Sequence, residues 1–322
     1  MADADLDRAL RLAAAHEGVV TAQQLIDGGC HPRWADRQVR RGSWQRPARG
    51  VYVPHDQPLA GLDLSRAAGA LAGSGVVVSG LVVLRELGLR WLPASDQVLA
   101  LVDPDVRTPS SGRVVLRRTT DVAQLETWPR DGQRLAPVAR AVVDGARGLS
   151  LRDARGVVLG AVADGWATVD TLRTHLDATQ RNGSGIVRRA ILDAERGCAS
   201  PPEAEVVDRL LGCGLPFYVN PELRLNGRLL GLPDIWFLGV GLGGEVESRE
   251  RHGEAQDVES TYDRHERMTA CGIELVHLSV RRIRLDAGTA AEHLVQRAVA
   301  RKWSGRQEPP GLVVVPRGPL LR

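Results

Sequence analysis

Apolar and polar positions in the first part of the chain follow the spacing of three short helices and then alternate. Apolar residues between positions 6 and 15 predict a first helix. Thr21 is placed to cap a second helix, which Gly28-Gly29 would end. Residues 31–42, HPRWADRQVRRG, predict a third helix with proline in its first turn and glycine beyond its end. The alternating stretch SWQRPARGVYVP predicts a β-hairpin, so residues 1–56 have the element order of a winged helix-turn-helix.

The predicted third helix has two different faces. At 100° per residue, four of its arginines fall within about 100° of one another, whereas Ala35 and Val39 lie on the opposite side. Two more arginines in the predicted hairpin extend this positive strip, and Asp36 is the one acid in residues 33–49. Such a concentration is typical of a nucleic-acid contact, although a solvated amphipathic helix is the alternative. We expect the following residues to bind double-stranded DNA: Arg33, Arg37, Arg40, Arg41, Arg46 and Arg49.

The hydrophobic pattern of residues 57–190 predicts an α+β middle domain. Strands are predicted at 97–102 and 113–118, and helices at 65–89, 137–147 and 151–165. Asp144 lies on an apolar helical face, where an aspartate more often caps a helix or pairs with a nearby arginine than marks a site.

Residues 191–302 predict a third domain with the order α-β-β-β-α-β-α and a mixed central sheet, which is an α/β fold with helices on both faces. Ser200 is the expected N-cap of its first helix, and residues 235–250 are expected to form a hairpin. Residues 303–322 are predicted to be a C-terminal tail. The expected fold class is therefore mixed α/β: a winged helix, an α+β middle region and a C-terminal α/β domain.

Composition and charge limit the setting. The 322 residues suffice for two or three domains. The net charge is only +3, and Lys302 is the sole lysine, so arginine carries nearly all the cationic charge. A GC-rich coding sequence explains this global bias, but guanidinium groups also bind phosphate bidentately. The four cysteines are far apart, which argues against a zinc ribbon or a disulfide framework. No apolar segment is long enough to cross a membrane, and the N-terminus predicts an acidic amphipathic helix in place of a signal peptide, so we expect a soluble, cytoplasmic protein.

Four acids of the last domain are candidates for a shared site: Glu203, Asp234, Glu245 and Glu247. Strand alternation puts Glu245 and Glu247 on one face, and the predicted hairpin would bring Asp234 beside them. Carboxylates held that close repel one another unless a divalent cation bridges them. We therefore expect Asp234, Glu245 and Glu247 to hold Mg²⁺ or Mn²⁺, which activates water for phosphodiester hydrolysis. His252 would serve as a proton shuttle or ligand.

Each acid also has a structural explanation. Ser200-Pro-Pro-Glu203 matches a capping box, in which the glutamate reaches back to the N-cap amide. Asp234 follows Leu-Pro and could end a turn, and Glu245 and Glu247 could lie on an exposed strand face beside arginines. His265 and His277 are expected to be structural.

The spaced pattern SPPE, LPD and GEVESRERH resembles the PD-(D/E)XK nucleases, specifically the branch related to very-short-patch-repair endonucleases. The resemblance covers roughly residues 197–285 and implies a restriction-endonuclease-like fold. It places Glu203, Asp234, Glu245 and Glu247 at the metal site, with His252 in support. The chain departs from the family pattern at Glu247, where that branch has aspartate and the wider superfamily lysine, and at Ser248, where glycine is usual. Lysine-assisted catalysis is excluded at this site because the only lysine lies far away in the sequence.

Residues 1 to about 150 resemble the AbiEi-type antitoxins of type IV toxin-antitoxin systems. The winged helix HEGVVTAQQLIDGGCHPRWADRQVRRGSWQRPARGVYVP carries the likeness, followed by VSGLVVLRELGL and APVARAVVDGAR. It implies sequence-specific binding of duplex DNA, often as autorepression.

Two hypotheses follow from these patterns. In the first, a DNA-binding protein hydrolyses DNA with its last domain and Mg²⁺ or Mn²⁺. In the second, a non-catalytic regulator or antitoxin-like repressor keeps a degenerate nuclease fold for DNA contact, homodimerisation or binding of a toxin or other protein. Few aromatic residues are available for base stacking, which disfavours a third reading as a binder of RNA or single strands.

Overall fold

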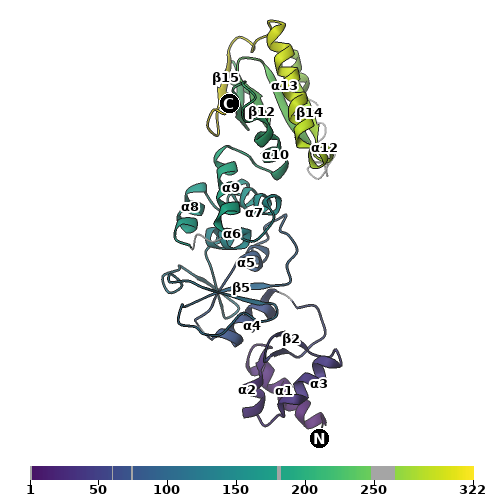
Figure 1. Cartoon of the computed structure of the whole chain (residues 1–322), viewed down its shortest axis with the longest axis vertical. Coiled ribbons are helices and arrows are strands. Elements are labelled where there is room, and N and C mark those ends of the chain that lie inside the picture. The colour runs from purple at the N-terminus through teal and green to yellow at the C-terminus, as the bar shows by residue number, and fades with distance from the viewer. Residues whose placement is uncertain (1, 60, 74, 180–182, 248–264) are drawn as a thin grey trace. The chain divides into compact units, whose positions relative to one another are not determined.

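The chain folds into two compact units. The computed structural model describes residues 2–59, 61–73, 75–179, 183–247 and 265–322. Unit 1 comprises Met1–Val157 and Gly165–Val187, and unit 2 comprises Val158–Asp164 and Arg188–Arg322. Both units combine helices with β-sheets, which confirms the mixed α/β class (Figure 1). The predicted winged helix and middle region thus belong to one compact unit.

The first part of unit 1 is a winged helix-turn-helix. Its elements are α1 (Ala2–Ala15), β1 (Val20–Thr21), α2 (Ala22–Asp27), α3 (Pro32–Arg40), β2 (Gln45–Ala48) and β3 (Val51–Val53). The strands form an antiparallel sheet in the order β1-β3-β2. Leu25, Trp34, Ala35 and Trp44 fill the core beneath the three helices. Element order and sheet agree with the sequence prediction, in which a turn follows α2 and a hairpin follows α3.

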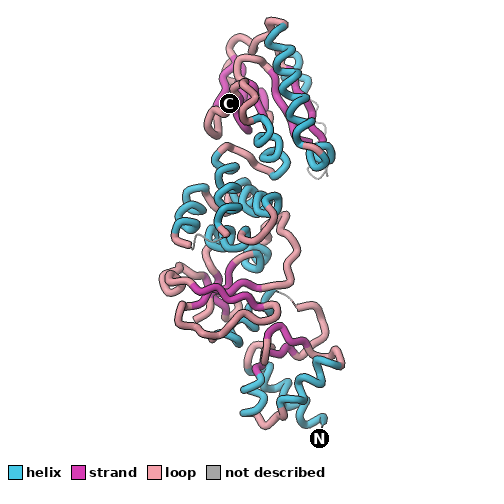
Figure 2. The backbone as a smooth tube through the Cα atoms, in the orientation of Figure 1, coloured by secondary structure: helices cyan, strands magenta, loops and turns pink. Residues whose placement is uncertain are grey.

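The second part of unit 1 is built on a mixed five-stranded sheet in the order β6-β5-β4-β8-β7. Helix α4 covers one face of this sheet, and α5 and α6 cover the other (Figure 2). The elements are α4 (Gly61–Ala72), β4 (Val77–Ser79), α5 (Leu81–Glu86), β5 (Val98–Val102), β6 (Val114–Arg118), β7 (Trp128–Arg130), β8 (Gln133–Leu135), α6 (Val138–Ala146) and α8 (Val169–Asp177). Helices α7 (Leu151–Ala163) and α9 (Ser184–Glu195) begin in unit 1 and end in unit 2.

The stretch 65–89, predicted to form packed helices, contains most of α4 and all of α5 but also the central strand β4 between them. Val76, Val77 and Val78 are buried there. A run of β-branched side chains buried on both faces fits a central strand better than a helix, because branching at Cβ restricts χ1 against the preceding helical turn. The sequence analysis did not predict this strand.

A buried ionic cluster, which we call the Asp144 cluster, joins β4, β6 and α6. Asp144 Oδ2 accepts hydrogen bonds from Ser79 Oγ (2.8 Å) and Arg140 Nε (2.7 Å), and its Oδ1 accepts one from Arg117 Nη1 (2.6 Å). Arg140 Nη1 also donates to Asp121 Oδ2 at 2.5 Å. The side chain of Asp144 is 0% exposed and that of Arg140 is 1% exposed. Asp144 therefore pairs with arginines, the more usual role expected for it.

Unit 2 is built around a four-stranded sheet in the order β14-β13-β12-β9, in which β13 and β14 are parallel and the other pairs antiparallel. The elements are α10 (Pro201–Leu210), β9 (Phe217–Val219), β10 (Glu222–Leu225), β11 (Arg228–Gly231), β12 (Ile235–Phe237), β13 (Leu242–Glu247), β14 (Glu274–Ser279), α12 (Val280–Leu285), α13 (Ala287–Trp303) and β15 (Leu312–Val315). Ile235 and Phe237 point into one core with residues of α10 and α13, whereas Trp236 belongs to a second core with Leu223 and Leu275. This alternation sorts the strand residues between the two faces of the sheet.

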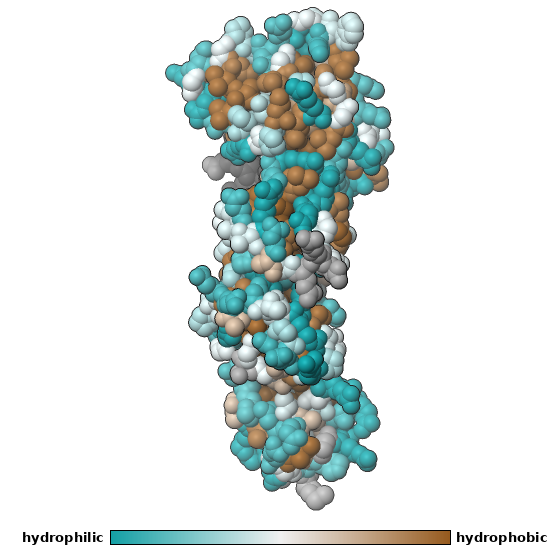
Figure 3. Space-filling view, turned by 60° about the vertical axis from the view of Figure 1, so that its left-hand side comes forward, coloured by the Kyte–Doolittle hydropathy of each residue, from teal (hydrophilic) through white to brown (hydrophobic). Residues whose placement is uncertain are grey.

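Residues 303–322 are not a tail, in contrast to the sequence prediction. Strand β15 pairs with β10 in a separate three-stranded sheet, in the order β11-β10-β15. Further on, the backbones of Phe217 and Leu321 exchange two hydrogen bonds of 3.0 Å. Alternate residues of β15 pack inward, while Val313 and Val315 stay exposed, as does Leu229 on β11. Hydrophobic residues gather accordingly on the surface of unit 2 (Figure 3).

Candidate functional site

Local capping interactions fix the turn between α2 and α3. Thr21 and Gln24 form a reciprocal capping box at the start of α2, with the Thr21 amide donating to Gln24 Oε1 at 2.8 Å. Gly29 follows α2 with a φ of +78°, a conformation that costs glycine little. His31 then caps α3, since its Nδ1 accepts from the Arg33 amide at 3.2 Å. These interactions set where α3 begins and therefore which of its residues face outward.

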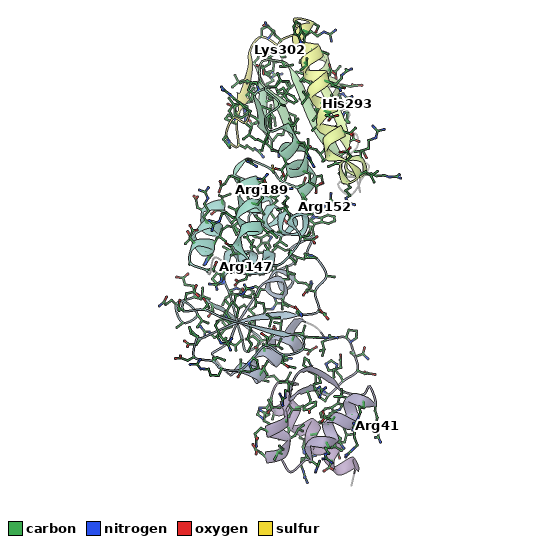
Figure 4. All side chains as sticks on the ribbon, in the orientation of Figure 1. Arg41, Arg147, Arg152, Arg189, His293 and Lys302 are labelled. Carbon is green, nitrogen blue, oxygen red and sulfur yellow. The ribbon has the colours of Figure 1, made fainter. Side chains whose placement is uncertain are left out.

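Helix α3 buries its aromatic and small residues and exposes its arginines. Trp34 is 3% exposed and meets Trp44 edge to face, with ring centroids 5.1 Å apart and an interplanar angle of 88°. Ala35 is fully buried, and Val39 packs against the same core. The exposed residues are Arg33, Arg37, Arg40 and Arg41, the last of which is labelled in Figure 4. The sequence had predicted these two faces but not the anchoring role of Trp34.

The guanidinium groups of α3 are available for a ligand. Within the described part of the chain, those of Arg33, Arg37, Arg40 and Arg41 form no hydrogen bond or ion pair. Asp36 is held to one side, because it accepts from Tyr52 Oη at 3.0 Å and from Arg46 Nη1 at 3.3 Å. Burial, followed by the hydrogen bond to Asp36, raises the pKa of the Tyr52 phenol. The single acid of the strip is thus occupied by the hairpin and leaves the α3 arginines unneutralised.

The hairpin β2–β3 is a short wing that lies against the middle region of unit 1. Only Arg49 and Gly50 connect its strands. The Arg49 amide donates to Ser111 Oγ and the Arg113 amide donates to the carbonyl of Pro47, both at 2.8 Å. A Cβ on Gly112, whose φ is +57°, would lie 2.3 Å from the Pro47 oxygen. The wing backbone is therefore clamped, although the side chains of Arg46 and Arg49 remain exposed.

In unit 2, the predicted pair of glutamates shares one face of β13 and meets a histidine from β14. Glu245 is opposite His277 in the parallel register. His277 Nδ1 lies 2.7 Å from Glu247 Oε1 and 3.9 Å from Glu245 Oε2. On its other side, His277 Nε2 lies 3.2 Å from His265 Nδ1. The Glu245 side chain is 9% exposed and that of Glu247 is 52% exposed, so the pair runs from the interior to the surface.

The other two predicted acids make backbone-directed contacts. Glu203 Oε2 accepts from the Ala199 amide and from Asn220 Nδ2, both at 2.8 Å, and Ser200 Oγ donates to Glu203 Oε1 at 2.7 Å. These contacts make Glu203 a capping and bridging residue at the start of α10. Asp234 Oδ2 accepts from the Val246 amide at 2.6 Å, which ties the start of β12 to β13 next to Glu245.

The described acids do not fit the predicted three-carboxylate metal site as they lie. Among residues 2–247 and 265–322, leaving out the few undescribed positions, no three His, Cys, Asp or Glu side chains gather so that they could hold a metal ion. Glu247 is engaged by His277, and Asp234 by a backbone amide. His252 lies outside the described residues. His277 was missed as a neighbour of the glutamates because parallel pairing of β13 with β14 joins segments about thirty residues apart, which local periodicity does not reveal.

One family profile matches the part of the chain that forms the winged helix. Residues 7–55 match the sequence profile of a family described as "Transcriptional regulator, AbiEi antitoxin". A solved structure, that of the RV2827C protein from Mycobacterium tuberculosis, is similar with 18% identity over 63% of this chain and 80% of its own, at a TM-score of 0.38. No curated protein matches the chain. No helix in the described ranges is long and apolar enough to cross a membrane.

Proposed function

We propose that this chain is a DNA-binding transcriptional regulator of the AbiEi antitoxin type, which recognises duplex DNA with α3. One observation carries the proposal: four exposed arginines without partners among the described residues project from the second helix of a helix-turn-helix. In such motifs that helix lies in the major groove and its side chains reach base edges. Arginine forms bidentate hydrogen bonds with guanine there. The family match over residues 7–55 supports the same function.

The exposed hairpin arginines have a supporting part. Arg46 and Arg49 lie beside α3 on a wing whose backbone is held by the loop around Ser111. A clamped two-residue turn has little freedom to enter a groove, so these side chains serve as contacts to phosphates. Arg46 remains linked to Asp36 across 3.3 Å, and this exposed ion pair is weak enough to be exchanged for a phosphate.

Selection from a random duplex library tests this function. The enriched duplex is titrated by fluorescence anisotropy against the wild type and the Arg37→Ala/Arg40→Ala variant. Loss of base-contacting arginines costs about 1–3 kcal/mol each, so we expect binding at least about 30-fold weaker, with relaxed selectivity. Arg306→Ala/Arg317→Ala is the matched control, because it removes two exposed charges from unit 2. Absence of any enriched sequence, or equal binding by both variants, would overturn the proposal.

The family match also suggests which molecules, besides DNA, this chain binds. An antitoxin implies a protein toxin as a second ligand, which co-expression and co-purification of neighbouring gene products would identify. Two inverted half-sites in the enriched duplex would indicate that the protein binds as a homodimer, because operator symmetry mirrors protein symmetry.

A second candidate function is hydrolysis of DNA by unit 2 with Mg²⁺ or Mn²⁺. It is supported by Glu245, a largely buried carboxylate on strand β13, with Asp234 directly before the neighbouring strand β12 and His277 on the neighbouring strand β14. The described acids do not fit a metal ion as they lie, so we derive no catalytic step through one. Nicking of supercoiled plasmid that requires Mg²⁺ or Mn²⁺ and is lost in Glu245→Ala is the expected result. An intact plasmid would remove this function and leave the regulatory one untouched.

A further inference from the structure

Helix α12 presents three arginines on its outer surface. In Val280–Leu285, Ile283 is 2% exposed and fixes the inner side of the helix. At 100° per residue, Arg281, Arg282 and Arg284 all lie within about 80° of the direction opposite Ile283. All three are exposed. We call these three residues the α12 arginine face.

The charges of the α12 arginine face are not neutralised by the described part of unit 2. None of its guanidinium groups has a hydrogen bond or ion pair there, whereas Arg297 and Arg301 on the adjoining α13 are bound to Glu274. The acid next to α12 is Asp286, and its carboxylate is occupied by the amides of Gly288 and Thr289 and by the Thr289 hydroxyl. Three unpaired guanidiniums on one short helix favour a polyanionic ligand.

Helix α12 directly follows the strand that pairs with the glutamate-bearing strand β13. Ser279, the last residue of β14, pairs with Glu247 at the end of β13, and α12 starts at the next residue. The α12 arginine face therefore borders the end of the sheet where the glutamates lie. Like charges on Glu245 and Glu247 would repel a polyanion at the sheet itself, so contact with such a ligand is confined to the helix.

We propose that the α12 arginine face is a second DNA contact, which holds the phosphate backbone while α3 recognises the sequence. This inference rests on the proposed function, since it requires DNA to be the ligand. A helix of six residues is only about 9 Å long, and three arginines side by side match consecutive phosphates better than base edges. Two contacts on one chain raise the affinity of each for the same duplex through effective concentration.

The experiment compares the salt dependence of DNA binding in full-length variants. Loss of three phosphate contacts should reduce the slope of log K against log[salt] by about 2.7, which corresponds to about 170-fold weaker binding at 0.15 M salt if 1 M is the reference. The variant is Arg281→Ala/Arg282→Ala/Arg284→Ala. Its binding is measured with two duplexes of about 60 base pairs, one that contains the sequence enriched from the random library and one in which that sequence is scrambled. Because phosphate contacts carry no sequence information, both duplexes should weaken equally.

The matched control removes three exposed charges of unit 2 from outside α12, one of them, Lys302, at the opposite end of α13: Lys302→Ala/Arg306→Ala/Arg317→Ala. Lys302 is labelled at that end in Figure 4. Circular dichroism establishes that both triple variants are folded, and a charge-retaining Arg→Lys triple at α12 should restore most of the slope. An unchanged slope in the α12 alanine variant, while α3 variants still lose binding, overturns this inference alone. Loss of binding to vesicles with 30% phosphatidylserine, with DNA binding intact, would also overturn it and assign the face to a membrane surface.

Discussion

Removal of the Asp144 carboxylate tests how the ionic cluster stabilises unit 1. Asp144 accepts three hydrogen bonds, from Ser79, Arg117 and Arg140, and these residues belong to β4, β6 and α6. The substitution Asp144→Ala deletes the acceptor but leaves all three donors. Since the side chains of Ser79 and Arg140 are inaccessible to solvent, water cannot replace the lost partner without opening the core.

The expected loss is about 3 kcal/mol. Removing one member of a buried ion pair costs about 3–5 kcal/mol, because a charge is left uncompensated. Two features favour the lower end of this range. Arg140 keeps a 2.5 Å contact with Asp121, and the side chain of Arg117 is 28% exposed and can be hydrated. For a unit of this size, about 3 kcal/mol lowers Tm by roughly 6–12 °C.

Scanning calorimetry of the full chain measures this loss, since it can separate the transitions of the two units. Asp105→Ala is the control, an exposed aspartate of the same unit whose side chain forms no hydrogen bond or ion pair in the described residues. The double variant Arg117→Ala/Asp144→Ala should recover part of the loss, because it also removes one of the orphaned charges. A shift of Tm for Asp144→Ala no larger than that of the control would refute the role given to the cluster.

Three further changes should have defined effects. Gly112→Ala should release the wing, because the new Cβ would lie 2.3 Å from the Pro47 oxygen at a φ unfavourable for alanine. The Arg49 amide should then exchange its hydrogen faster, and an unchanged exchange rate would contradict the clamping of the wing. Burial, and after it the charge of the Arg140 guanidinium, lowers the pKa of His175 below its ordinary value of 6.5. The unfolded chain therefore binds more protons than the folded chain, and unit 1 should lose stability as pH falls below about 6.5. Urea midpoints between pH 7.5 and 5.5 should show this loss, and His175→Gln should reduce it; equal pH dependence in both proteins would count against it. Glu203→Ala should destabilise unit 2 by about 0.5–1.5 kcal/mol in urea unfolding, because two partly buried donors lose their acceptor. A loss of activity without a loss of stability would instead favour a catalytic role.

Local signals in the sequence were sufficient for the winged helix and for most of unit 2. Thr21, Pro32 and Ser200 are capping signals, and each lies at the helix start that it predicted. Signals of this kind act over a few residues, so they survive in the folded chain. Strand β4 was missed because a short apolar run does not distinguish a buried strand from a buried helix. Strand β15 was missed because its partner β10 lies about ninety residues earlier in the chain.

The two candidate sites, the α3 arginines and the carboxylates of unit 2, also differ in how far local sequence signals predict them. Arg33, Arg37 and Arg40 are spaced by four and three residues and Arg41 follows directly, so helical geometry alone placed the four on one face. The carboxylates come from α10, the residue before β12, and β13, and their side-chain contacts depend on packing that the sequence pattern does not specify. Strand alternation placed Glu245 and Glu247 on one face, but it did not indicate that His277 of the neighbouring strand β14 would lie beside them.

Because the wing is clamped, the proposed DNA contacts have to come mainly from other parts of the chain. A free wing would add contacts next to α3, but here the hairpin turn is joined to the loop around Ser111 and offers only the side chains of Arg46 and Arg49. Because the net charge of +3 gives little long-range attraction, the proposed DNA binding would rely on local groups of arginines that are unpaired among the described residues. Helix α3 is one such group and the α12 arginine face is another. Sequence selectivity should therefore depend on α3, whereas the salt dependence of binding should be shared between the two units.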